Sequence, residues 1–87
     1  MNYVIEVAEL FVLRRQTAEI LTPTDYEIIA EWEKEEIPLE IVLNSINHVF
    51  DRLAQSNEPF KIETIADVQT EVEKNFASWL QKLNDRS

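Results

Sequence analysis

Residues 21–52, LTPTDYEIIAEWEKEEIPLEIVLNSINHVFDR, predict two helices joined by a sharp corner. Thr22 stands where an N-cap is expected, because its hydroxyl can accept a hydrogen bond from a free backbone N–H of the first turn. Pro23 follows at the first helical position, and Asp25 stands three residues after the cap, as in a capping box. This combination predicts a helix over about residues 23–36.

The corner between the two helices is expected at Ile37 and Pro38. A residue before proline avoids the α region, whereas proline itself suits the first turn of a helix. The next helix is therefore predicted over about residues 38–55. Its apolar residues recur at helical spacing and should form one core-facing stripe: Leu39, Val42, Leu43, Ile46, Val49, Phe50 and Leu53.

The segment before this stretch is apolar on almost every side. Nine of the eleven residues from Tyr3 to Leu13 are apolar, the exceptions being Glu6 and Glu9. The β-branched content is compatible with a strand, but the two acids are three residues apart and no hairpin partner is near, so a helix over about 2–17 is predicted. A helix that is apolar nearly all round is either central in its domain or covered by another chain.

The last helix is predicted over about residues 64–84, with Thr64 as its cap and Asp67 at the capping-box position. Its apolar residues fall within about 120° of arc, the width of a core-facing stripe. They are Val68, Val72, Phe76, Trp79, Leu80 and Leu83. Together the four helices predict an all-α fold, a compact four-helix bundle that forms a single domain over residues 1–87.

The composition excludes several classes of site. With no cysteine among the 87 residues, disulfides, thiolate nucleophiles and thiolate metal sites are all ruled out. With no glycine, the loops that cradle nucleotide phosphates lack the residue that lets the backbone approach the ligand. No cofactor is expected.

The charge is strongly acidic and unevenly spread. The net charge is −9, and residues 22–40 hold seven acids and one base, a net −6. An acidic face is repelled by phosphate backbones and by anionic lipid, which makes nucleic acid an unfavourable partner. The N-terminus lacks the basic residues of a secretory signal, and no segment approaches the ~20 apolar residues of a membrane span. We therefore expect a cytoplasmic protein that does not bind membranes.

The titratable residues do not form a recognisable catalytic set. His48 is the sole histidine, and Ser45 precedes it by one helical turn, but nucleophilic catalysis also needs an orienting acid and oxyanion donors. The glutamates of the second helix lack the loop pattern of a calcium site and suit a solvated acidic face better. The pair Arg14 and Arg15 suits a helix C-terminus, with anion binding as the alternative. We expect no enzyme and no metal site.

The ordered features from about Val4 to Trp79 resemble a set of uncharacterised small bacterial helical proteins. The shared features are the Thr22-Pro23-Thr24-Asp25-Tyr26 cap, the Glu31-Trp32 pair, the Ile37-Pro38-Leu39 corner, Val42-Leu43, Ile46 with Phe50, Lys61-Ile62 and Val72-Glu73. The resemblance covers nearly the whole chain. It implies a helical fold and supplies no activity.

A weaker similarity is to the DnaD-type domain of bacterial primosome proteins, which pairs a similar helix start with a helix corner. The DNA-binding signature of that family spaces Tyr, Ile and Trp in a late helix. Here Ile65 matches, but Lys61 stands at the Tyr position and Val68 at the Trp position. The similarity to the DnaD-type domain therefore does not predict DNA binding by this chain.

The sequence leaves three classes of function to be tested. The leading one is a non-catalytic protein–protein interaction or scaffold module, the alternative is a DnaD-like module that binds nucleic acid in replication, and the third is an enzyme using His48. The apolar first helix further predicts a homodimer, unless the other three helices wrap it. The expected self-association surface is Val4, Ile5, Ala8, Phe11, Val12 and Ile41.

Overall fold

The computed structural model describes residues 2–16, 19–56 and 61–85. It contains four helices, α1 (Tyr3–Arg15), α2 (Pro23–Lys34), α3 (Leu39–Gln55) and α4 (Ala66–Asp85), and no strand within these ranges. The all-α four-helix fold predicted from the sequence is confirmed. The predicted helix bounds differ from the observed ones by one or two residues at most of the described ends, as is usual for fraying termini.

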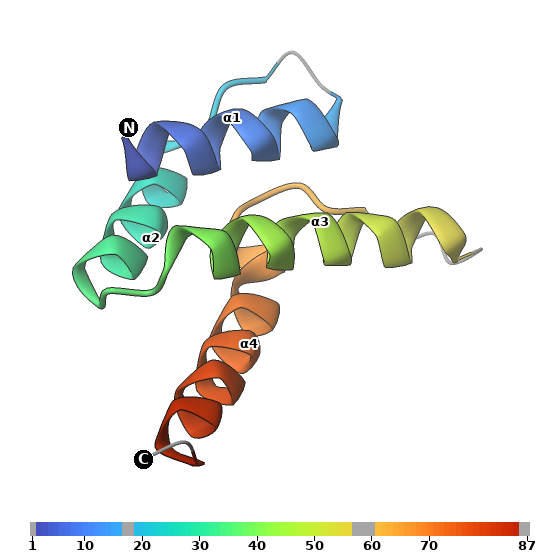
Figure 1. Cartoon of the computed structure of the whole chain (residues 1–87). Coiled ribbons are helices and arrows are strands. Elements are labelled where there is room, and N and C mark those ends of the chain that lie inside the picture. The colour runs from blue at the N-terminus through green and yellow to red at the C-terminus, as the bar shows by residue number, and fades with distance from the viewer. Residues whose placement is uncertain (1, 17–18, 57–60, 86–87) are drawn as a thin grey trace.

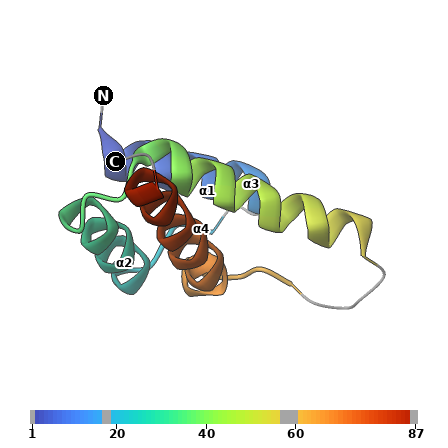
Figure 2. The same ribbon diagram turned by 60° about the horizontal axis from the view of Figure 1, so that its bottom comes forward.

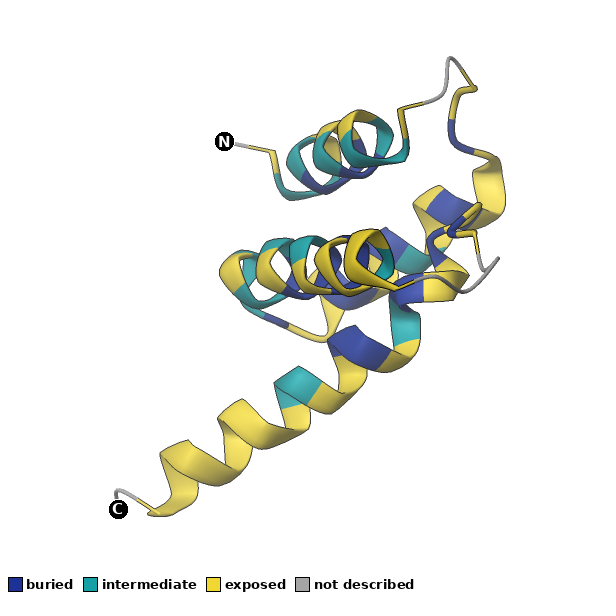
Figure 3. Cartoon of the chain, turned by 90° about the vertical axis from the view of Figure 1, so that its right-hand side faces the viewer, coloured by how far each residue is buried: buried dark blue, intermediate teal, exposed yellow. Residues whose placement is uncertain are grey.

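The helices are arranged around α3. Figure 1 shows α1 on one side of α3 and α4 on the other, with α2 next to the start of α3. The helix pairs with the most extensive contacts are α3 with α4, α1 with α3, and α1 with α2. The Cα radius of gyration is 13.4 Å, against about 12 Å for a compact chain of this length. The excess fits the course of α4, whose second half runs away from the other helices (Figure 3).

The core is formed by all four helices and by the segments that connect them. Phe11 of α1 meets Phe50 of α3 edge to face, with ring centroids 5.8 Å apart. The apolar residues that follow Pro59 suit a chain returning to the core, and Ile62 is buried there, while Phe60 lies outside the described residues. The core residues are Val7, Ala8, Phe11, Leu21, Ile29, Trp32, Ile37, Val42, Ile46, Val49, Phe50, Ile62, Ile65, Val68 and Val72.

The start of α2 follows the predicted capping box. The hydroxyl of Thr22 accepts a hydrogen bond from the backbone N–H of Asp25, and the Asp25 carboxylate accepts one from the backbone N–H of Thr22 at 3.0 Å. The other Asp25 oxygen accepts a hydrogen bond from the backbone N–H of Ile65, also at 3.0 Å. One buried carboxylate thus holds the starts of α2 and α4 side by side, as Figure 2 shows.

The end of α2 forms a Schellman motif without glycine. The backbone N–H of Ile37 donates to the carbonyl of Trp32, and that of Glu36 donates to the carbonyl of Glu33. Glu36 therefore adopts a left-handed conformation, with φ of 61°. Because a Cβ makes this conformation unfavourable by about 1–2 kcal/mol, the corner carries some strain.

Apolar residues at core spacing in α2 and α4 are exposed in part. Tyr26 lies one helical turn before the buried Ile29, but it is exposed, because the start of α2 packs through Asp25 and Leu21 instead. The predicted stripe of α4 is buried only in its first half. Val68 and Val72 are fully buried, whereas Trp79, Leu80 and Leu83 are exposed because no other described helix reaches them.

Candidate functional site

The exposed half of α4 is the strongest candidate for a functional surface. The helix leaves the core after Phe76, which still packs against it, and the later apolar side chains are accessible: Trp79 is 37% exposed, Leu80 42% and Leu83 45%. Figure 3 shows this half of α4 extending alone beyond the other helices. Large apolar side chains grouped on one face are unusual on a free protein surface, where apolar residues are mostly scattered singly.

Two aromatic side chains of this half stack on each other. The ring of Phe76, which is half-buried, stacks on the ring of Trp79 with centroids 5.9 Å apart and planes at 20°. Leu80 lies four residues after Phe76, and Leu83 four residues after Trp79, so these side chains share one helical face. We call Phe76, Trp79, Leu80 and Leu83 the α4 stripe.

Polar contacts fix the base of α4 onto α3. The Arg52 guanidinium donates to the Glu71 carboxylate at 2.9 Å, and Glu71 is almost buried. One turn further along α4, the Asn75 amide donates to the Ser45 hydroxyl at 2.8 Å. The Ser45 hydroxyl in turn donates to the backbone carbonyl of Ile41 at 2.7 Å. The position from which the α4 stripe projects is therefore set by hydrogen bonds and not by apolar packing alone.

These contacts occupy the serine of the candidate Ser45–His48 pair. Ser45 is fully buried between α3 and α4, where its hydroxyl is occupied as a donor and as an acceptor. His48, one helical turn later, is exposed. Ser45 is therefore not an accessible hydroxyl beside His48, because α4 covers it.

The charge around the α4 stripe differs from that of the rest of the chain. Within residues 74–85, Lys74 and Lys82 oppose the single acid Asp85, a net +1. Residues 22–40 carry −6 by the same count. The α4 stripe thus lies in a mildly basic segment attached to an acidic protein.

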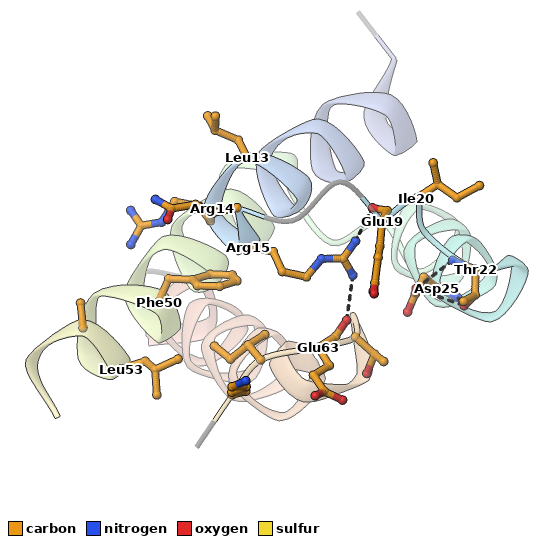
Figure 4. Close-up of a pocket in the computed structure, with 15 residues that line it drawn as sticks. Leu13, Arg14, Arg15, Glu19, Ile20, Thr22, Asp25, Phe50, Leu53 and Glu63 are labelled. Carbon is orange, nitrogen blue, oxygen red and sulfur yellow. Dashed lines mark hydrogen bonds between the residues drawn. The ribbon is translucent and has the colours of Figure 1, made fainter. Parts of the chain in front are cut away.

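A second candidate is an open hollow of about 1060 Å³ between the end of α1, the start of α2, the second half of α3 and residues 61–64. Figure 4 shows Arg15 crossing it, where the guanidinium donates to the backbone carbonyl of Glu63 at 2.8 Å and to that of Glu19 at 2.5 Å. The same guanidinium lies 5.3 Å from the centroid of the Phe11 ring. Arg15 therefore acts as a tie between connecting segments and the core.

The neighbouring arginine is also occupied. The Arg14 guanidinium donates to the Asp51 carboxylate at 2.7 Å and to the Asn47 amide oxygen at 3.4 Å, and it lies over the Phe50 ring. Both arginines at the end of α1 therefore link α1 to other parts of the fold, which favours the structural interpretation over anion binding.

The acidic residues do not gather into a ligand set. In the part of the chain that the structure describes, no group of three or more His, Asp or Glu side chains could hold a metal ion. Burial and, to a lesser extent, the charge of Glu33 raise the pKa of Tyr3 to about 12. The Tyr3 hydroxyl donates to the backbone carbonyl of Ile37 at 2.8 Å, which is a structural role.

The predicted self-association surface on α1 is only partly available. Ala8 and Phe11 lie in the core, because α2 and α3 both pack against α1, so their inclusion was wrong. Val4, Val12 and Ile41 are half-buried and packed against the core. Only Ile5, at 52% exposure, is an open apolar side chain of this set.

Among the described residues, no helix combines the length and the apolar character needed to cross a bilayer. Comparisons with protein-family models, with curated proteins and with solved structures found no match to this chain.

Proposed function

We propose that this chain is a small, acidic, non-catalytic interaction or scaffold module of the cytoplasm that binds another protein through the α4 stripe. The observation that carries the proposal is the exposure of Trp79, Leu80 and Leu83 on a helix half that projects from the core. Tryptophan is one of the side chains that contribute most to binding energy in protein interfaces, because it buries a large apolar area.

The geometry elsewhere gives the competing functions less support. Ser45 is buried with its hydroxyl already bonded to Ile41 and Asn75, whereas His48 is exposed, so the structure gives no support to a pair of nucleophile and base. Arg14 and Arg15 are engaged in contacts within the fold, and the net charge of −9 opposes binding to phosphate backbones. A DnaD-like function in replication is the alternative that the experiment must separate.

Affinity capture from an extract of the source cells tests the proposal. The immobilised wild-type chain is compared with a Trp79→Ser, Leu83→Ser variant and with a matched variant, Ile5→Ser, which removes an equally exposed side chain elsewhere. We expect a protein that the wild type and Ile5→Ser retain and the double variant loses. Retention by all three chains would contradict a binding role for the α4 stripe.

A DNA mobility-shift assay at increasing salt tests the alternative. Contacts to phosphates weaken steeply as salt rises. A shift at low salt that disappears at high salt would favour a nucleic-acid-binding function, whereas no shift at low salt is the expected result.

A further inference from the structure

We propose that the α4 stripe pairs with the α4 stripe of a second copy of this chain, in an antiparallel and two-fold symmetric contact. This inference rests on the proposed function, since it names the partner of the same surface. It also moves the predicted homodimer from α1 to α4, because three exposed apolar residues lie within five positions of α4, whereas the exposed Ile5 and Leu13 of α1 are eight positions apart.

The spacing of the α4 stripe suits such a contact. Phe76, Trp79 and Leu83 follow one another at three and four residues, as do the a and d positions of paired helices. In an antiparallel pair, Trp79 of the first copy lies opposite Leu83 of the second. By symmetry, Leu83 of the first copy then lies opposite Trp79 of the second. A two-fold arrangement needs only one self-complementary patch, which this face supplies.

The projection of α4 makes room for the second copy. The four helices span 44 Å along their longest axis, and the second half of α4 stands clear of α1, α2 and α3 (Figures 1 and 3). Because the apolar face of α4 is buried at Val68 and Val72, a second helix that uses this face can lie only along the part that follows. The two stripes therefore overlap near their C-terminal ends, and the two cores stay apart.

The charges favour this pairing over one through α1 or α2. Each copy carries −9, and the densest acidic segment, residues 22–40, includes α2 and the corner after it. An antiparallel contact through residues 76–85 places these acidic segments at opposite ends of the dimer, where solvent and salt screen their repulsion. Residues 74–85, with a net +1, add little repulsion at the contact itself.

The contact area predicts a weak dimer. Stable protein interfaces bury about 1,200–2,000 Å² in total, and four side chains on a single helical face fall short of that. We therefore expect a reversible dimer with a dissociation constant on the order of 100 µM, whose population depends on concentration.

Sedimentation equilibrium tests the inference directly. Between about 10 µM and about 1 mM, the wild-type mass should rise from 10.2 kDa towards twice that value. Leu83→Glu should weaken the association roughly tenfold or more, because it places a charge in the contact. Ile5→Glu introduces the same charge at an exposed residue outside the α4 stripe and should leave the association unchanged. Circular dichroism must show equal helicity in all three chains.

Tryptophan fluorescence gives an independent reading at the contact. The chain has two tryptophans, so a Trp32→Phe variant leaves Trp79 as the sole emitter. Its emission should shift to shorter wavelength as concentration rises through the dimerisation range, because dimerisation removes the indole from water. A constant emission in samples that sediment as dimers would overturn the inference.

The outcomes separate this inference from the function on which it rests. A wild-type chain that stays at 10.2 kDa at about 1 mM overturns the symmetric dimer. If the capture experiment still yields a partner that depends on Trp79 and Leu83, the α4 stripe is an interaction surface for a different protein. A dimer that Ile5→Glu disrupts and Leu83→Glu does not would place the contact on α1 and would also overturn the inference.

Discussion

The carboxylate of Asp25 accepts a hydrogen bond from the backbone N–H of Ile65, forty positions later in the chain, at 3.0 Å. The same side chain closes the capping box of α2 with Thr22. Because Asp25 is only 3% exposed, its loss would leave the buried N–H of Ile65 and the partly buried N–H of Thr22 without their acceptor.

Asp25→Ala should therefore destabilise the fold by about 2–4 kcal/mol, the sum of a lost cap and an unsatisfied buried donor. Urea denaturation followed by circular dichroism measures this change. Thr22→Ala removes only the cap hydroxyl and should lower the free energy of unfolding by about 1 kcal/mol. Equal effects of the two substitutions would show that the bond to Ile65 contributes nothing.

Truncation of the two tryptophans should change the stability of the fold by different amounts. Trp32 is buried in the core, so Trp32→Ala should lower the free energy of unfolding by about 3–5 kcal/mol. Phe50→Ala should have a similar effect. Trp79→Ala should lower it by less than about 1 kcal/mol in dilute solution, since the side chain is substantially exposed. If urea denaturation shows that Trp79→Ala lowers the free energy of unfolding as much as Trp32→Ala does, this prediction is wrong.

Glycine at the corner after α2 should stabilise the protein. Glu36 adopts a φ of 61°, which glycine reaches without steric strain. Glu36→Gly is expected to raise the free energy of unfolding by roughly 0.5–1 kcal/mol, after the extra freedom of the unfolded chain is subtracted. The matched control is Glu35→Gly, because Glu35 has a φ of −77° and gains no such relief. A melting temperature that falls for Glu36→Gly would show that the corner is unstrained.

The titration of Tyr3 should make the fold less stable at high pH. Its pKa is raised to about 12 in the fold, first by burial and then by the charge of Glu33, against about 10 in an unfolded chain. Between these values the unfolded state releases the proton and the folded state keeps it, so stability falls as pH rises from about 10 to about 12. Tyr3→Phe should remove this part of the pH dependence, measured by denaturation at several pH values, although it also loses the hydrogen bond to Ile37.

Local signals made most of the fold predictable. The cap at Thr22 and the corner at Ile37 depend on neighbouring residues only, so the sequence contains all the necessary information. The apolar spacing of α4 predicted one face for Val68 and Trp79 alike, and they do share a face. What the spacing does not contain is the length over which another helix covers that face, and this determines that Val68 is buried and Trp79 is exposed.

The remaining errors also come from tertiary contacts. Ser45 looked like one polar residue on a polar face, and only the placement of Asn75 on α4 explains its burial. Glu71 gave no signal of its pairing with Arg52, because nineteen positions separate them and neither lies in a recognisable motif. The symmetric contact and the interaction function are still predictions, since neither the helical pattern nor the arrangement of a single chain identifies a partner.

The part of α4 beyond Asn75 is helical before any partner binds, and this affects the affinity for a partner. Isolated helices shorter than about 12–15 residues are marginal in water, because forming the first turn is unfavourable while extending an existing turn is not. Residues 76–85 extend a helix whose earlier turns are already held on α3 by Glu71 and Asn75. The anchored turns therefore act as a nucleus for the exposed ones. Any partner that binds Trp79 and Leu83 would gain affinity from a helix formed in advance, and weakening the anchor at Asn75 would reduce that affinity without touching the binding surface.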